Sequence, residues 1–258
     1  MLLEYKNSKI SYTTAGEGSA MVLLHGFLET LEMWDELTTE LSETHQIIAI
    51  DLLGHGKTDS IGYIHTMEAM ADAVLFVLKY LNIKKAKFIG HSMGGYVALA
   101  LADSQPELFE GLCLMNSTFE ADSEERKSLR KRAIIMAQNQ YDNLVRMSFA
   151  NLFAPESKKR FPIKYNKALE IARKTPVQGY IAAQEGMMKR DNRLEIFNNI
   201  SGKKLMILGK KDTLIDIKKT TSQILNTSVV IETLSEGHMS HVENYKELSY
   251  ILLRFSEK

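Results

Sequence analysis

Cysteine is nearly absent from this chain, since Cys113 is the only one among 258 residues. One thiol cannot form an internal disulfide, so a disulfide-stapled scaffold is excluded, and a reducing, cytoplasmic compartment is expected. Cys113 lies in the apolar run 111–115, which predicts a packing role in a buried strand rather than a reactive thiol.

An excess of charge and a long apolar segment are also missing. The 32 Lys and Arg residues balance 32 Asp and Glu residues, so a dedicated nucleic-acid binder with a basic surface is not expected. The most apolar helical stretch, 70–81, contains Asp72 and Lys79 and is shorter than the ~20 residues that span a bilayer. Glu4 interrupts the first apolar residues. We therefore expect neither membrane insertion nor a signal peptide.

Short apolar runs alternate with helical patterns along most of the chain. Such runs are typical of strands that are covered on both faces of a parallel sheet. Strands are expected at 2–6, 9–14, 20–24, 46–50, 86–89, 111–115, 204–208 and 228–231, and helices at 32–43, 66–82, 94–104, 214–225 and 243–256. The pattern predicts an α/β fold with a hairpin at its start and a mostly parallel central sheet flanked by helices.

Residues 118–200 interrupt this alternation. They show no strand pattern, and they contain three of the four prolines and eight of the nine arginines. Their 16 Lys and Arg residues exceed their 10 Asp and Glu residues by six. We interpret 118–200 as a helical insertion between two parts of a core, 1–117 and 201–258. Its positive surplus is either a solvated surface or a feature that attracts anionic substrates.

The sequence Gly90-His91-Ser92-Met93-Gly94 lies directly between an expected strand and an expected helix. A nucleophilic serine sits on such a sharp turn in a strained conformation, and glycines beside it let the neighbouring backbone approach. Ser92 is therefore the candidate nucleophile, and Gly90 and Gly94 are expected to provide the room. His91 and His25 are expected to form structural hydrogen bonds.

A serine nucleophile needs a general base and an acidic residue that orients the base. Asp212 and His238 each follow a late strand, so both are expected at the carboxyl edge of the sheet. Asp216, expected inside the next helix, is the alternative acid, and His241, expected in a turn, is the alternative base. A metal site on His238 and His241 lacks further ligands of recognisable spacing, so neither a metal nor a cofactor is expected.

On these residues the chain resembles the α/β-hydrolase fold superfamily over essentially its whole length. The matching motifs are His25-Gly26-Phe27, Asp51-Leu-Leu-Gly54-His-Gly56, the turn at Ser92, Asp212 and Gly237-His238. The resemblance implies a catalytic triad of Ser92, His238 and Asp212. It also implies an oxyanion hole from the backbone N–H groups of Phe27 and Met93, loop support from His25, Gly26, Gly90 and Gly94, and a cap formed by 118–200.

The implied activity is that of a serine hydrolase, a carboxylesterase for small-molecule esters of small to medium acyl chain. Several apolar residues of the insertion could shape such a pocket: Met136, Leu144, Met147, Phe149, Leu152, Phe153, Tyr180, Met187 and Met188. The alternatives are a lyase of the menaquinone-pathway synthase type, a carbon–carbon bond hydrolase, and a non-catalytic ligand receptor. Tyr96 departs from the synthase pattern, which usually has arginine there. The oligomeric state is left open.

Overall fold

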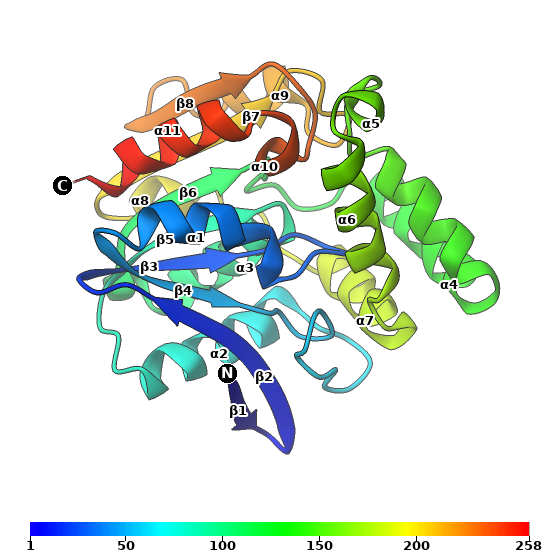
Figure 1. Cartoon of the computed structure of the whole chain (residues 1–258), viewed down its shortest axis with the longest axis horizontal. Helices are drawn as coiled ribbons and strands as arrows, with labels where there is room; N and C mark the ends of the chain where they lie inside the picture. Colours follow the sequence, from blue (N-terminus) through cyan, green and yellow to red (C-terminus); the bar gives the residue numbers. More distant parts are fainter. Residues whose placement is uncertain (258) are drawn as a thin grey trace.

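The computed structural model describes residues 1–257, and its centre is an eight-stranded sheet (Figure 1). The strands are β1 (Leu2–Tyr5), β2 (Ser8–Ala15), β3 (Ser19–Leu24), β4 (His45–Ile50), β5 (Ala86–His91), β6 (Phe109–Met115), β7 (Lys203–Gly209) and β8 (Val229–Leu234). Their order is β1-β2-β4-β3-β5-β6-β7-β8. β1 pairs antiparallel with β2, β2 pairs antiparallel with β4, and every other pair is parallel. The predicted hairpin and mostly parallel sheet are confirmed.

Helices cover both faces of the sheet because successive strand residues point to opposite sides. Val22 and Leu24 of β3 belong to an apolar core shared with α2 and α3, whereas Met21 and Leu23 belong to a second core shared with α1 and α11. Cys113 lies in the second core, where burial raises the pKa of its thiol. The helices that precede β6 or follow β7 in the chain are η1 (Leu31–Trp34), α1 (Asp35–Leu41), α2 (Met67–Tyr80), α3 (Met93–Ser104), η2 (Pro106–Leu108), α9 (Ile217–Ser222), α10 (Ser240–Glu243) and α11 (Tyr245–Ser256).

The segment between β6 and β7, which the structure describes in full, contains helices and loops but no strand. It forms α4 (Glu124–Ala150), α5 (Ser157–Arg160), α6 (Pro162–Arg173), α7 (Val177–Met188) and α8 (Leu194–Asn199). Figure 1 shows α4 to α7 standing together at one end of the sheet, beyond the carboxyl ends of the parallel strands. These helices have their own apolar core, which includes Phe149, Tyr165 and Tyr180. α8 packs on α3 instead, with Phe197 in the first core of the sheet.

The longest of these helices, α4, has 27 residues but is far from apolar. Its helical backbone is interrupted at Gln140, where φ is −140° and ψ is 48°. Among residues 1–257, no helix combines the length and the apolarity needed to cross a membrane.

The start of α3 lies against the end of β3 at very short range. A Cβ atom added to Gly94 would lie 2.2 Å from the carbonyl oxygen of Leu24, and one added to Gly90 would lie 2.5 Å from the backbone nitrogen of Gly95. Real Cβ atoms do not approach backbone so closely, so any larger residue would push α3 away from the sheet. The turn at residue 92 therefore has its shape only because glycine occupies both flanking positions.

We expect Gly94→Ala to lower the free energy of unfolding by about 2 kcal/mol. Overpacking against backbone costs about 3 kcal/mol, and this exceeds the ~1 kcal/mol that alanine gains over glycine in an unconstrained helix. Urea denaturation of the variant and of wild type measures the difference. Ser104→Ala, at the exposed end of the same helix, serves as the control and should change stability by no more than about 0.5 kcal/mol. A more stable Gly94→Ala protein would contradict the packing argument.

Candidate active site

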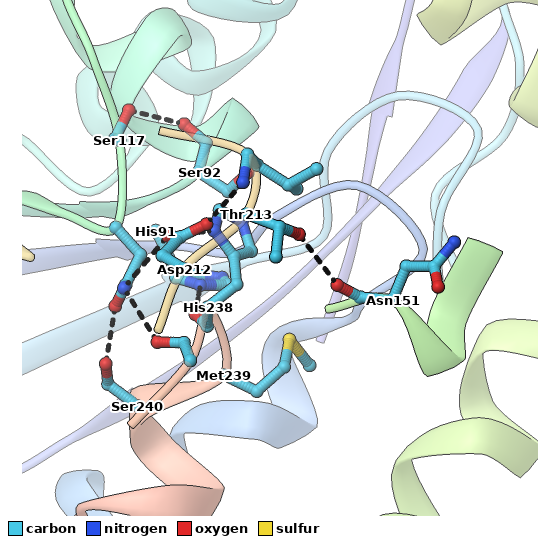
Figure 2. A network of polar contacts seen from close by, with 12 residues as sticks. His91, Ser92, Ser117, Asn151, Asp212, Thr213, His238, Met239 and Ser240 are labelled. Atoms are coloured by element: carbon cyan, nitrogen blue, oxygen red, sulfur yellow. Dashed lines mark hydrogen bonds and ion pairs between the residues drawn. The ribbon is translucent and has the colours of Figure 1, made fainter. Parts of the chain in front are cut away.

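Three loops that follow neighbouring strands bring Ser92, His238 and Asp212 to the same edge of the sheet. Ser92 follows β5, Asp212 follows β7 and His238 follows β8. The Nδ1 atom of His238 lies 2.6 Å from Oδ2 of Asp212, and Ser92 and His238 line one cavity of about 320 Å³. Figure 2 shows the three residues close together, with a polar network around Asp212 and His238 and with the carbonyl of Ser92 bonded to Ser117. Within residues 1–257, the Ser92 hydroxyl makes no hydrogen bond to His238; such contacts are often long before substrate binds.

Ser92 has a backbone conformation that non-glycine residues rarely adopt, with φ at 49° and ψ at −114°. Two hydrogen bonds with neighbouring residues stabilise this strained conformation. The Ser92 N–H donates to the Met115 carbonyl at 3.0 Å, and the Ser117 hydroxyl donates to the Ser92 carbonyl at 2.7 Å. The serine is therefore fixed by the loop after β6 on one side and by the start of α3 on the other.

Asp212 is held as a carboxylate. Its Oδ1 accepts from the Leu214 N–H at 2.8 Å, and its Oδ2 accepts from Asn116 Nδ2 at 3.3 Å as well as facing His238. Its side chain is fully buried. Burial by itself raises the pKa of Asp212, but the charge and hydrogen bond of His238, together with these donors, outweigh burial and hold the pKa below its usual range. The carboxylate therefore fixes Nδ1 of His238 as the protonated nitrogen.

Asn116 is a functional residue that sequence reasoning missed. It directly follows β6 and has a positive φ of 43°, a conformation that asparagine tolerates better than most residues. Its Nδ2 donates to Asp212 and to the Gly237 carbonyl at 3.2 Å, while its Oδ1 accepts from the Ser240 hydroxyl at 2.6 Å. One side chain thus positions both the acid loop and the histidine loop. The signal was available, because Asn116 ends a strand at the same edge as Asp212 and His238.

The loop after β3 presents a free backbone donor beside Ser92. Within residues 1–257, neither the Phe27 N–H nor the Met93 N–H donates a hydrogen bond. His25 fixes this loop, because its Nε2 accepts from the Leu52 N–H at 2.9 Å and its Nδ1 donates to the Gly26 carbonyl at 2.7 Å. Burial lowers the pKa of His25, in agreement with a neutral ring.

Gly26 permits close approach of the serine loop to this donor loop. A Cβ atom at Gly26 would lie 2.7 Å from Nδ1 of His91 and 3.2 Å from Cβ of Ser92. The Gly26 N–H donates to Oε2 of Glu29 at 2.7 Å. Glu29, which sequence reasoning also missed, is therefore part of the support of this loop.

Glu29 and His91 form a fully buried ion pair behind the site, with Oε2 and Nδ1 separated by 2.5 Å. The other nitrogen of His91, Nε2, lies 3.0 Å from the carbonyl oxygen of His238 and must donate to it. Because Glu29 is a carboxylate, both ring nitrogens are donors and the ring is an imidazolium. Burial disfavours both charges, but the attraction between them raises the pKa of His91 and lowers that of Glu29 to about 2.

The cluster of Glu29, His91 and His241 has the composition of a metal site, but His91 has no free nitrogen for a metal ion. The three residues offer ligand atoms within 4.8 Å of one another. Both nitrogens of His91, however, already carry protons that are donated to Glu29 and to the His238 carbonyl. Burial lowers the pKa of His241 to about 4, so this ring is neutral. The cluster is best described as the ion pair of Glu29 and His91 with the neutral ring of His241 beside it.

The alternative acid and base have other roles. Asp216 is not inside a helix as expected; it is the exposed residue before α9, and its side chain accepts from the Lys219 N–H at 3.0 Å. It caps the helix because the helix begins at Ile217 rather than 214. His241 lies in the one-turn helix α10 rather than in a turn, 3.7 Å from Glu29. Asp51 accepts from the N–H groups of Leu31 and Lys57.

The walls of the cavity come from both parts of the chain. The sheet side contributes Phe27, Leu28, Glu29, His91, Ser92, Tyr96, Leu214, His238 and Met239, and the helical segment contributes Arg126, Leu129, Arg130, Ala133, Ser148, Asn151, Leu152, Tyr180, Gln184 and Met187. Of the apolar residues considered from sequence, Leu152, Tyr180 and Met187 therefore face the cavity. Met136 and Met147 are exposed, and the others are buried away from it.

Comparison with known proteins gives a consistent set of relatives. A family model described as alpha/beta hydrolase fold matches residues 19–245. The curated 3-oxoadipate enol-lactonase 1 of Acinetobacter baylyi (strain ATCC 33305 / BD413 / ADP1) is 28% identical over 226 residues, which cover 86% of this chain and 83% of that protein. Other curated relatives match over 31–66% of their own length.

Two solved structures share the fold over almost the whole chain. A thermophilic esterase from Thermogutta terrifontis has a TM-score of 0.91 at 24% identity, covering 96% of this chain and 93% of its own. An enol-lactonase from Burkholderia xenovorans LB400 also has a TM-score of 0.91, at 22% identity, with 99% of each chain covered.

The ion pair of Glu29 and His91 predicts a bell-shaped pH dependence of stability. The lowered pKa of Glu29 contributes stability that is present above pH 4.5 and is lost as the pH falls toward 2. The raised pKa of His91 contributes stability that is present below pH 6.5 and is lost as the pH rises through its folded value. The contribution of the ion pair to stability is therefore largest between pH 4.5 and pH 6.5.

We expect the double variant Glu29→Gln/His91→Gln to be destabilised most between pH 4.5 and 6.5, relative to wild type. The difference in unfolding free energy between the variant and wild type should shrink by roughly 2 kcal/mol from pH 5 to pH 3, because the Glu29 carboxylate stabilises wild type less as the pH falls. Urea denaturation across this pH range measures the deficit. Glu32→Gln, which changes an exposed glutamate in the adjoining helix η1, is the matched control. A deficit that does not change with pH would show that the pair is not ionised.

Proposed function

The chain belongs to the α/β-hydrolase fold family, and on that premise we propose that it is a serine hydrolase that cleaves carboxylic esters of small to medium acyl chain. The observation that carries the proposal is the bond between Asp212 and Nδ1 of His238 at the rim of a cavity that also contains Ser92. A histidine held this way has its unprotonated Nε2 free to act as a base.

In the proposed reaction, His238 takes the proton of Ser92 as the serine oxygen attacks the ester carbonyl. Asp212 stabilises the imidazolium that forms, since the carboxylate is already ionised and fully buried. The tetrahedral oxyanion accepts hydrogen bonds from the free N–H groups of Phe27 and Met93. The alcohol then leaves with a proton from His238, and water activated by the same histidine hydrolyses the acyl-enzyme.

Residues 118–200 act in this proposal as the cap over the active site, through α4 and α7. These helices contribute Arg130 and Tyr180 to the cavity wall opposite Ser92. A cavity of about 320 Å³ suits a small to medium acyl group better than a long chain. Two relatives are named as an enol-lactonase and an esterase, and both names refer to carboxylic esters, the lactone being a cyclic one.

The first test compares wild type with Ser92→Ala on p-nitrophenyl acetate, butyrate and octanoate, with fluorophosphonate labelling of each protein. We expect acetate and butyrate to react faster than octanoate. The variant should lose both labelling and roughly 10⁴–10⁶ of the rate, because the nucleophile is gone. Retained turnover in Ser92→Ala would overturn the nucleophile, and a preference for octanoate would overturn the proposed pocket size.

Two results of that test would favour the alternative functions. Labelling of Ser92 without ester turnover would indicate an active serine whose reaction is that of a synthase or a carbon–carbon bond hydrolase. Absence of both labelling and turnover in a folded wild-type protein would instead favour a ligand receptor.

The acid assignment has a matched pair of variants four residues apart. We expect Asp212→Asn to lower kcat by about 10⁴-fold with the fold intact, because an amide no longer holds His238 in the required tautomer. Asp216→Asn, which changes an exposed helix cap, should keep nearly the full rate. Steady-state kinetics on p-nitrophenyl butyrate, with circular dichroism to check folding, distinguishes them. The reverse ranking would exchange the two roles.

A further inference from the structure

A buried cluster with one surplus positive charge borders the cavity. Asp122 forms ion pairs with two arginines: its Oδ2 accepts from Nε of Arg130 at 2.6 Å, and its Oδ1 lies 2.7 Å from Nη1 of Arg190. The exposed fractions of the three side chains are only 1%, 11% and 5% respectively. Two guanidinium groups thus share one carboxylate in a poorly hydrated place, where an uncompensated charge is costly.

Arg190 does not line the cavity, and its Nε and Nη1 groups are bound within the protein. Its Nε donates to the Glu120 carbonyl at 3.0 Å, its Nη1 also donates to the Met187 carbonyl at 3.0 Å, and its guanidinium lies over the ring of Tyr96 at 4.0 Å. Arg190 therefore serves to tie α7 to the loop before α4 and to the start of α3. The surplus charge is not available to a ligand through this residue.

Arg130 is the arginine that faces the cavity. It lines the same cavity as Ser92, and its Nη1 donates to Oε1 of Gln184 at 2.7 Å. Within residues 1–257 its Nη2 donates to no protein atom. The N–H groups of Nη2 are thus left as donors, and a guanidinium N–H forms a charge-assisted hydrogen bond with a carboxylate oxygen.

The rest of the cavity wall adds positive rather than negative charge. Arg126 lies one helical turn before Arg130 on α4, lines the same cavity, and forms no ion pair within residues 1–257. Glu29 is the only acidic residue of the wall among the described residues, and His91 neutralises it. The cavity as a whole is therefore electropositive on the side of α4.

We propose that this cavity binds a carboxylate group of the substrate through Arg130, with Arg126 adding attraction, so that the ester cleaved at Ser92 is a half-ester or lactone of a dicarboxylic acid. The inference rests on the proposed esterase function and specifies its substrate class. A carboxylate matches the site because its single negative charge equals the one surplus positive charge of the buried cluster. The guanidinium of Arg130 and the side-chain amide of Gln184 then define where the carboxylate of the substrate lies.

The first experiment needs no variant. Two esters of equal length are compared on wild type: mono-(4-nitrophenyl) adipate, which has a free carboxylate, and 4-nitrophenyl methyl adipate, in which that group is neutral. We expect kcat/KM to favour the free acid by roughly 10- to 100-fold, the range for a charge-assisted hydrogen-bonded pair. The corresponding glutarate pair tests a shorter reach. Equal or higher kcat/KM for the neutral ester in both pairs would overturn the proposal.

The second experiment assigns the preference to a residue. Arg130→Gln should bring the ratio of the two kcat/KM values to within about threefold of one, since a neutral amide replaces the charged fork. The variant leaves Asp122 paired one to one with Arg190, so the fold is expected to survive. Arg132→Gln, an exposed arginine of the same helix, should keep the wild-type ratio. An unchanged ratio in Arg130→Gln, or a loss in Arg132→Gln alone, would overturn the assignment.

A binding measurement separates this proposal from the proposed function. Calorimetry with monomethyl adipate on Ser92→Ala requires no turnover, and binding should weaken at least about tenfold in Ser92→Ala/Arg130→Gln. If wild type hydrolyses no ester but this difference is found, the carboxylate site stands and the esterase function fails. If wild type hydrolyses neutral esters and no difference is found, the esterase function stands and the carboxylate site fails.

Discussion

The buried ion pair between Glu29 and His91 joins three of the loops at the site, those after β3, β5 and β8. Glu29 belongs to the loop after β3 and accepts the Gly26 N–H, which orients the free donor at Phe27. His91 is the last residue of β5, directly before Ser92, and it donates to the carbonyl of His238 after β8. Since a carboxylate and an imidazolium can be buried only when each compensates the other, these loops cannot separate without leaving a charge unpaired.

A parallel sheet makes this arrangement possible. With β3, β5, β6, β7 and β8 all pointing one way, every loop after them arrives at the same edge. Residues far apart in sequence then become neighbours, as with Asn116, which bonds to both Asp212 and Gly237. The helical segment 118–200 starts from the same edge, so its helices α4 and α7 close the cavity over that edge without disturbing the sheet (Figure 1).

The positive surplus of that segment is distributed over several kinds of contact. Arg146 and Arg173 share Asp142 on the exposed surface, where such pairs contribute little to stability. Arg193 anchors the segment to carboxylates of α2 and α3. Only around Arg130 does the surplus coincide with burial and with a cavity. The effect of each charge in the segment thus depends on whether its side chain lies on the surface, between helices or beside the cavity.

The sequence alone determined the alternation of strands and helices and the turn at Ser92, because apolar periodicity and flanking glycines are local signals. It also placed Asp212 and His238 at strand ends, since the rule for parallel sheets needs only the strand positions. It did not determine the helix cap at Asp216, the bonds of Asn116, the pairing of Glu29 with His91, or the sharing of Asp122 by Arg130 and Arg190. These depend on distances between residues remote in the chain, and only the packing of the loops and of α4 and α7 against the sheet decides such distances.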